Sequence, residues 1–290
     1  MIKDAVKEKA TEAVNKLTDL PEGITASLDE RETSYTLPKT DSNGDKDTVP
    51  VKVLYKDAKG NVVGEDTINV PVKVVSSTPK SVVVFEGDTP NSEDVKKGIT
   101  PGEGGTVGDP TNVPSTVGKA GDKDVEVEVP VTYENGKFKE NVKVPVTVLP
   151  KPTADSVIVP KDLSEKELKD KVGKDAENAI NNEEFKKKLP EGATVKVDLT
   201  NVTLPKTSTP GKAGEVEVPV IYTVNGKEYK TTVKVPVTVL PVAKGEVTVV
   251  KNTTPDKLKE LAKDKAKEAV EATDFKSKLP EGATVTVGDV

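Results

Sequence analysis

The chain repeats itself, and this repetition limits its fold more than any other feature of the sequence. The stretch Leu-Pro-Glu-Gly-Ala-Thr-Val at 189–195 returns unchanged at 279–285, each time after a lysine-rich amphipathic segment. Near-identical copies usually form an array in which each unit packs on its neighbours. The repeat therefore overrides the one or two domains that 290 residues would otherwise suggest.

A second motif, Val-Pro-Val, occurs in pairs along the chain. The pairs lie at 49–51 with 70–72, 129–131 with 144–146, and 218–220 with 235–237. The second and third pairs enclose Asn135-Gly136 and Asn225-Gly226. Asn-Gly between alternating apolar runs is a strong hairpin signal. Each pair therefore predicts two antiparallel strands.

The proline inside each predicted strand cannot donate to a ladder of hydrogen bonds. We therefore expect these strands to lie at sheet edges, where proline and outward lysine also discourage edge-to-edge association between neighbouring copies.

The two motifs divide the chain into four segments: 1–75, 76–150, 151–241 and 242–290. The third has every predicted element, whereas the first begins inside a helix and the fourth ends before its Val-Pro-Val strands. We expect these two to be partial copies from a longer array. The junctions Leu149-Pro150-Lys151-Pro152 and Leu240-Pro241 are proline-rich, which predicts stiff linkers.

Three segments contain an amphipathic helical pattern, whereas the second has the glycine-rich stretch 101–106 instead. In the third segment, Ser164 and Glu167 form a capping-box signature; in the fourth, Thr254 and Pro255 mark a helix start. Apolar residues follow at three- and four-residue spacing, which predicts one buried face on each helix. These residues are Leu168, Val172, Ala176, Ala179, Ile180 and Phe185 in the third segment, and Leu258, Leu261, Ala262, Ala266, Ala269, Val270 and Phe275 in the fourth.

Composition removes several classes of function. The chain has no His and no Cys, which removes the usual ligands of zinc, copper, haem and iron–sulfur clusters, and every Ser-His or Cys-His pair. We expect no enzyme activity, no active site and no cofactor. A single arginine, Arg31, and a net charge of −6 argue against nucleic-acid binding. No apolar run reaches the roughly 18 residues of a membrane span, so we expect no membrane insertion.

The sequence around the predicted hairpins resembles a known family. Val-Pro-Val, then Tyr133 or Tyr222, Asn-Gly-Lys, and a closing Val-Lys-Val-Pro-Val-Thr-Val are similar to the Rib/alpha-like repeats of Gram-positive surface proteins. The resemblance implies tandem immunoglobulin-like β-sandwich modules, several with an inserted amphipathic helix, arranged as an elongated array. With modules of about 40 Å, estimated from strand length, such an array would exceed about 100 Å.

The resemblance also implies a location and a role. It places the parent protein outside the cell, attached to the bacterial cell wall, with the segments acting as a stalk that projects an adhesive domain. The partners of each segment would then be the neighbouring repeats of the same chain. As an alternative, the repeats themselves bind a host surface glycoprotein or glycan.

One loop gathers oxygen-bearing side chains at alternate positions, as calcium loops do: Asp41, Asn43, Asp45 and Asp47. Glycine stands at the fourth position instead of the sixth, and Lys52 stands where a bidentate glutamate belongs. We therefore expect a solvated turn and no metal, with these four residues as the only candidate ligands.

Three other patterns have a structural and a functional interpretation. The Leu-Pro-Lys-Thr tetrapeptides at 37–40 and 204–207 resemble a sortase signal, but their recurrence at equivalent places favours a structural role. Lys143 and Lys234 could form isopeptide bonds only if buried, and their alternation with valine predicts outward side chains. The tyrosines after Val-Pro-Val (Tyr55, Tyr133 and Tyr222) are expected to fill the cores instead of forming an exposed aromatic row.

Overall fold

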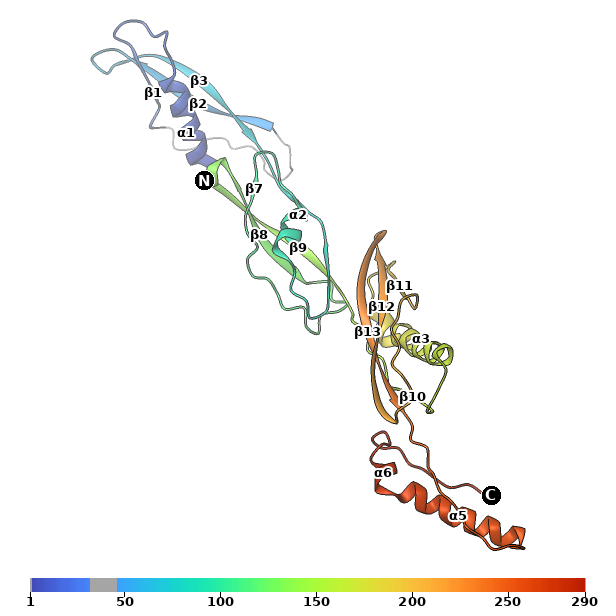
Figure 1. Ribbon diagram of the computed structural model, residues 1–290. Coiled ribbons are helices and arrows are strands. Elements are labelled where there is room, and N and C mark those ends of the chain that lie inside the picture. The colour runs from blue at the N-terminus through green and yellow to red at the C-terminus, as the bar shows by residue number, and fades with distance from the viewer. Residues whose placement is uncertain (1, 32–45, 290) are drawn as a thin grey trace. The chain divides into compact units, whose positions relative to one another are not determined.

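The fold is mainly β: 33% of the residues are in strands, which form several sheets, and 24% are in helices. The structure, a computed structural model, describes residues 2–31 and 46–289 (Figure 1). The helices are α1 (Ile2–Asn15), α2 (Ser92–Lys97), the 3-10 turn η1 (Glu134–Gly136), α3 (Glu165–Asn181), α4 (Glu183–Lys187), α5 (Pro255–Glu271) and α6 (Thr273–Lys276).

Thirteen strands are present in the described residues. They are β1 (Thr25–Leu28), β2 (Lys46–Lys56), β3 (Val62–Lys73), β4 (Thr78–Pro79), β5 (Val82–Phe85), β6 (Ile99–Thr100), β7 (Thr106–Val107), β8 (Glu126–Tyr133), β9 (Phe138–Leu149), β10 (Val157–Val159), β11 (Thr194–Val197), β12 (Gly211–Val224) and β13 (Lys227–Val239).

The chain divides into two compact units that do not follow the predicted segment boundaries. One contains Met1–Lys80, Lys96–Thr111 and Glu128–Lys143, and the other contains Ser81–Val95, Asn112–Val127 and Val144–Val290. The division runs through the second segment, so strands β8 and β9 contribute residues to both units.

The third segment is built on a four-stranded sheet of order β10-β13-β12-β11. The β12–β13 hairpin turns at Asn225-Gly226, where both residues have positive φ angles, as the Asn-Gly signal predicts. Strand β10 lies parallel to β13, with Val157 opposite Val237 and Val159 opposite Val239. Helix α3 packs with this sheet, and the six predicted apolar residues from Leu168 to Phe185 are all buried.

The second layer of this core is not a sheet in the described residues. Helix α3 forms part of it, and the irregular stretch that follows β11 packs against the same core through Leu199, Val202 and Leu204. A Cβ placed on Gly173 of α3 would lie 2.5 Å from a methyl carbon of Leu199, so helix and loop are in close contact at this glycine.

The sheet of the second segment has the same plan. Its order is β5-β9-β8-β7, and β5 is parallel to β9 with Val82 opposite Val146 and Val84 opposite Val148. The short helix α2, with one buried residue, Val95, is the helix of this segment.

The first segment contains a three-stranded sheet of order β1-β2-β3. Helix α1 contributes Val6 and Ala10 to a small core with Val49, Val51 and Val70. Strand β3 pairs with β2 along one side, and no strand within residues 2–31 and 46–289 pairs with its other side.

The expectation that the Val-Pro-Val strands are edge strands is confirmed for β3 within the described residues and is wrong for the other five. Strands β2, β8, β9, β12 and β13 are inner strands of their sheets. In the second and third segments the prolines are tolerated because each stands one residue beyond the reach of a short outer strand. Strand β10 pairs with β13 from Val237 onward, just after Pro236. Strand β11 likewise pairs with β12 from Val220 onward, just after Pro219. The prolines therefore occupy a local edge on a central strand.

The helix starts agree with the sequence signals. The Ser164 hydroxyl accepts a hydrogen bond from the Glu167 amide at 3.3 Å, and the Ser164 amide donates to the Glu167 carboxylate at 3.4 Å, completing the capping box. Thr254 caps α5 by accepting from the Lys257 amide. Helix α5 differs from α3 in one respect: none of its residues is buried. Within the described residues, no helix combines the length and hydropathy needed to cross a membrane.

Candidate functional site at the segment junctions

The candidate calcium ligands fall mostly outside the part of the chain that the structure describes. Asp41, Asn43 and Asp45 lie outside the described residues, and so does the tetrapeptide at 37–40. Asp47 is described: it is exposed, and its carboxylate accepts from the Thr48 amide at 2.8 Å. Among the described residues, no three carboxylates stand close enough together to hold a metal ion.

The second Leu-Pro-Lys-Thr copy has a structural role. Thr207 is buried, and its hydroxyl donates to the carbonyl of Leu163 at 3.0 Å. Its own carbonyl accepts from the amide of Asp162, a residue held at a positive φ angle. The tetrapeptide thus fixes the loop that leads into α3.

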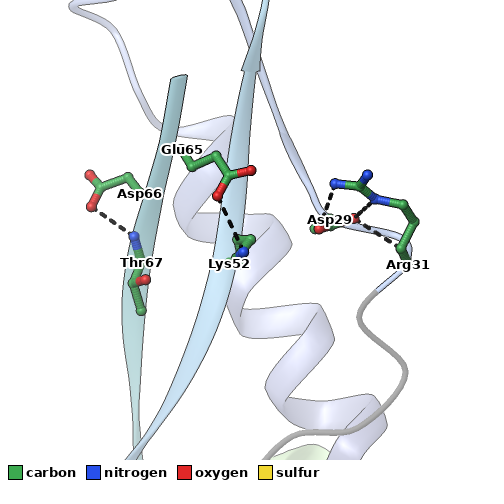
Figure 2. Close-up of polar contacts among 6 residues, drawn as sticks. All are labelled: Asp29, Arg31, Lys52, Glu65, Asp66 and Thr67. Atoms are coloured by element: carbon green, nitrogen blue, oxygen red, sulfur yellow. Dashed lines mark hydrogen bonds and ion pairs between the residues drawn. The ribbon is translucent and has the colours of Figure 1, made fainter. Parts of the chain in front are cut away.

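Polar contacts on the first sheet involve the one arginine of the chain (Figure 2). The Asp29 carboxylate accepts from the Arg31 guanidinium at 2.9 and 3.1 Å and from the Arg31 amide at 3.0 Å. These hydrogen bonds lower the pKa of Asp29 below its usual range. Lys52 on β2 pairs with Glu65 on β3 at 3.2 Å. Each of these interactions links residues of the first segment, so none of them indicates a ligand.

The junction between the second and third segments is packed into the core of the third. Tyr222 on β12 is fully buried, and its hydroxyl donates to the carbonyl of Pro150 in the junction at 2.6 Å. Burial raises the pKa of the Tyr222 phenol, so the hydroxyl stays protonated and remains a donor.

Aromatic and ionic contacts hold the same junction. Phe85 at the end of β5 meets the Tyr222 ring edge-on, with ring centroids 5.4 Å apart, and the Phe185 ring is tilted relative to the Tyr222 ring, with centroids 6.3 Å apart. Lys151 pairs with Asp88 at 2.6 Å, although both side chains are half exposed, which makes this pair a small contribution. The ring contacts and the Tyr222–Pro150 hydrogen bond therefore carry most of the attachment.

The equivalent tyrosine of the second segment makes an equivalent attachment. Tyr133 on β8 is buried, and its hydroxyl donates to Glu140 at 2.9 Å and lies 2.9 Å from the Ser77 hydroxyl in the preceding junction. The Ser77 amide donates to the same carboxylate at 3.0 Å. Burial is the main cause that raises the pKa of Tyr133. Each tyrosine thus holds the linker that enters its own segment.

The glycine-rich stretch 101–106 packs directly on Tyr133. A Cβ on Gly105 would lie 2.8 Å from a ring carbon of Tyr133, and one on Gly102 would lie 2.9 Å from the carbonyl oxygen of Ser76. Only glycine allows the backbone to approach this closely. The prediction that these tyrosines fill the cores is confirmed for Tyr133 and Tyr222, whereas Tyr55 is half buried.

The predicted outward lysines are exposed. Lys143 lies at an exposed position of β9, and Lys234 on β13 lies 3.7 Å from both Glu215 and Glu217 on the neighbouring strand. Neither lysine is buried in the way that an isopeptide bond would need.

A cavity of about 460 Å³ lies beside the open edge of β3. One wall is α1, through Ala5 and Val6, and the other is the stretch Val70–Val75. Residues of the second segment also line it, among them the rings of Tyr133 and Phe138 and the charged residues Glu103, Glu134, Lys139 and Glu140. Its volume falls in the range of ligand-binding pockets.

Comparisons with known proteins identify no family. No family model matches the chain, and no curated protein matches it. Similar solved structures include an endo-fucoidan hydrolase of glycoside hydrolase family 107 (10% identity, 76% of this chain, 39% of that chain, TM-score 0.18). An I-band fragment from titin is similar over 76% of this chain and 89% of its own, at 9% identity and a TM-score of 0.16. The EC1-3 fragment of Drosophila N-cadherin matches over 78% and 92% of the two chains, at 12% identity and a TM-score of 0.15. The chain spans about two fifths of the length of the hydrolase.

The junction contacts were not predicted from the sequence. The tyrosines were expected to fill the cores, but nothing in the sequence pairs Tyr222 with the carbonyl of Pro150, 72 positions earlier. A signal for the other junction is present in Gly102 and Gly105, because glycine also marks places where the backbone approaches another group closely.

Proposed function

We propose that this chain is a spacer: a tandem array of immunoglobulin-like β-sandwich modules that acts as a stalk and holds an adhesive domain away from a bacterial cell wall. The matching orders of the sheets in the second and third segments support the array. In the third segment the sandwich has α3 and the stretch Leu199–Leu204 in place of a second sheet, which fits a long variant of the repeat.

The observation that carries the proposal is the attachment of junctions to cores. A flexible linker would let adjacent modules collapse onto one another, so a spacer needs linkers that are held. The Tyr222–Pro150 hydrogen bond and the Phe85–Tyr222 ring contact fix the junction at 149–152. The Ser77–Tyr133–Glu140 contacts do the same at the junction before the second segment.

The cell-wall location and the adhesive domain rest on the resemblance of the Val-Pro-Val hairpins to the Rib/alpha-like repeats. The proposed partners follow from it: neighbouring repeats in the same chain and, through the domain that the stalk projects, a host surface protein or glycan.

Small-angle scattering tests the proposal. We expect a maximum dimension above about 100 Å, from four segments of strands at ~3.3 Å per residue. A compact particle would contradict a spacer. A glycan array and a pull-down with host serum proteins provide the second arm: a spacer binds nothing in either, whereas specific binding by this chain would replace the spacer with a ligand-binding module.

A further inference from the structure

The four-stranded sheets of the second and third segments share one feature of topology: the first strand along the chain pairs with the last. In the second segment, residues 82–85 of β5 lie parallel to residues 146–149 of β9. In the third, residues 157–159 of β10 lie parallel to residues 237–239 of β13. The chain enters each sheet through the first strand of this pair and leaves it through the second. We call the two pairs the terminal pairs.

A parallel terminal pair has a definite mechanical consequence when the chain is pulled from both sides. Parallel strands run in the same direction, so the entry into β10 and the exit from β13 lie at opposite ends of the pair. Opposing forces on entry and exit therefore slide the two strands past each other along their length. All hydrogen bonds of the pair are then loaded together, whereas a force applied at one end would break them one after another.

The path of the force leaves most of each segment unloaded. In the third segment, tension that enters at Val157 crosses the terminal pair to β13 and leaves after Val239. Strands β11 and β12 and helix α3 lie between these two points in the sequence and carry no tension until the pair separates. In the second segment, β7 and β8 lie between β5 and β9 in the same way. The terminal pair thus sets the force at which either segment begins to unfold.

Hydrogen bonds just beyond the paired residues lengthen both terminal pairs. In the third segment the Leu240 amide donates to the Val159 carbonyl at 2.8 Å. In the second, the Glu86 amide donates to the Leu149 carbonyl at 2.8 Å. Each terminal pair therefore has one more backbone bond to break before its strands can slide.

Side chains strengthen the pairs on both faces. On the outward face, a serine and a threonine hydroxyl meet across each pair, 2.8 Å apart for Ser81 and Thr147 and 3.5 Å apart for Ser156 and Thr238. The inward valines of the third segment, at 157, 159, 237 and 239, are buried in its core. A backbone hydrogen bond is stronger in such a low-dielectric environment than in water.

We propose that the two terminal pairs are mechanical clamps that keep the second and third segments folded under tension. The inference rests on the proposed function, because a stalk that holds an adhesive domain transmits every pull on that domain through its own segments. It adds a property that spacing alone does not need. Resistance to forced unfolding depends on the rate of unfolding and therefore on the bonds that break first.

Single-molecule pulling of the full chain in two directions tests the clamp of the third segment on an unchanged fold. The chain has no cysteine, so introduced cysteines define where the force is applied. Thr153→Cys with Lys244→Cys applies the force to opposite ends of the β10–β13 pair and loads it in shear. Thr153→Cys with Lys234→Cys applies it at one end and peels β10 from β13. All three positions are exposed.

We expect the unfolding force in shear to be at least about twofold higher than in peeling at the same loading rate, because the bonds of three residue pairs break together. The shear event should release the chain from Val157 to Val239, about 300 Å at ~3.6 Å per residue. Equal forces in the two directions, or a lower force in shear, would overturn the proposal.

The outcome separates the clamp from the spacer. All three attachment points lie outside the junction at 149–152, so the pulled segment is tested without the junction contacts. An extended particle in small-angle scattering with equal forces in the two directions would refute the clamp alone. A compact particle with a strong resistance to shear would refute the spacer alone.

A matched pair of proline substitutions in β10 tests the backbone hydrogen bonds themselves. The Val159 carbonyl faces β13, so the Val159 amide also faces β13, and the Ile158 amide faces the outer side of the sheet. Val159→Pro removes one of about four backbone bonds and should lower the shear force by about a quarter or more. Ile158→Pro removes none of them and should change the force by less than about a tenth.

Circular dichroism checks that both proline variants fold. An equal loss of shear force in the two folded variants would show that the backbone bonds of the terminal pair do not bear the load, and would overturn the proposal. If Val159→Pro fails to fold, the comparison of the two pulling directions decides the question by itself, since it leaves the terminal pair intact.

Discussion

At the scale of single residues, the Tyr222 hydroxyl carries the most specific prediction. Tyr222→Phe keeps the ring in the core but leaves the buried Pro150 carbonyl without its donor. A buried acceptor without a partner costs about 1–3 kcal/mol. We expect the free energy of unfolding to fall by that amount in urea denaturation.

Tyr229 provides the matched control, because it lies directly opposite Tyr222 in the β12–β13 register and is half buried. Tyr229→Phe should change stability by less than about 0.5 kcal/mol. Equal losses from both substitutions would mean that the bond to Pro150 is not what stabilises the junction.

A second residue-scale prediction concerns Asp175 on α3, which has a buried carboxylate oxygen without a hydrogen-bond partner. Burial, together with the nearby Asp155, raises the pKa of Asp175. A carboxyl group with a raised folded pKa stabilises the fold only at low pH, and this contribution is lost as the pH rises from the unfolded pKa, about 3.9, through the folded pKa.

Asp175→Asn removes this titration. The variant should melt at a higher temperature than the parent at pH 7, and the advantage should shrink as the pH falls to 3. Asp170→Asn, at an exposed position on the same helix, should show no such growth with pH. Thermal melts of the three proteins across this pH range measure the difference, and an advantage that is the same at both pH values would contradict the assignment.

At the scale of secondary-structure elements, the contact of α3 with the stretch after β11 decides how well the second layer packs. Gly173 leaves no room for a side chain beside Leu199. Gly173→Val should therefore destabilise the protein by about 1–3 kcal/mol through overpacking. Lys174→Val, one residue along on the exposed side, should cost less than about 0.5 kcal/mol.

A double-mutant cycle with Leu199→Ala checks the cause of the Gly173→Val effect. Because the two side chains compete for the same space, the double variant should be more stable than the sum of the single losses implies. Strict additivity would show that Leu199 is not the residue that Gly173→Val displaces.

The sequence predicts some of these elements well and others poorly, for physical reasons. Hairpins and helix starts depend on local signals, such as Asn225-Gly226 and the Ser164 capping box, and the structure confirms both. The placement of the Val-Pro-Val strands depends on how far other strands extend beside them, which proline alone does not encode. Burial of the helices also depends on their surroundings. Helices α3 and α5 have similar apolar patterns, but α3 is buried because the third segment supplies a sheet for it, whereas no residue of α5 is buried.

At the scale of the whole molecule, the contacts predict that the two later junctions differ in stiffness. The junction at 149–152 is held by the Tyr222 bond and by Phe85, whereas the stretch from Pro241 to Thr253 leads to a helix with no buried residue. A spacer needs every junction to be held as the junction at 149–152 is. The stretch from Pro241 to Thr253 would be held in this way only if a neighbouring module or a partner covered α5.

Spin labels measure this difference directly, because the chain has no cysteine to interfere with introduced ones. Labels at the exposed positions Lys123 and Lys230 bracket the first junction, and labels at Lys230 and Lys259 bracket the second. Pulsed electron double resonance should give a narrow distance distribution for the first pair and a broad one for the second. Tyr222→Ala should broaden the first, because it removes both the hydrogen bond and the ring contact. Two equally broad distributions in the parent would show that the junction contacts do not stiffen the chain, and the spacer proposal would lose its physical basis.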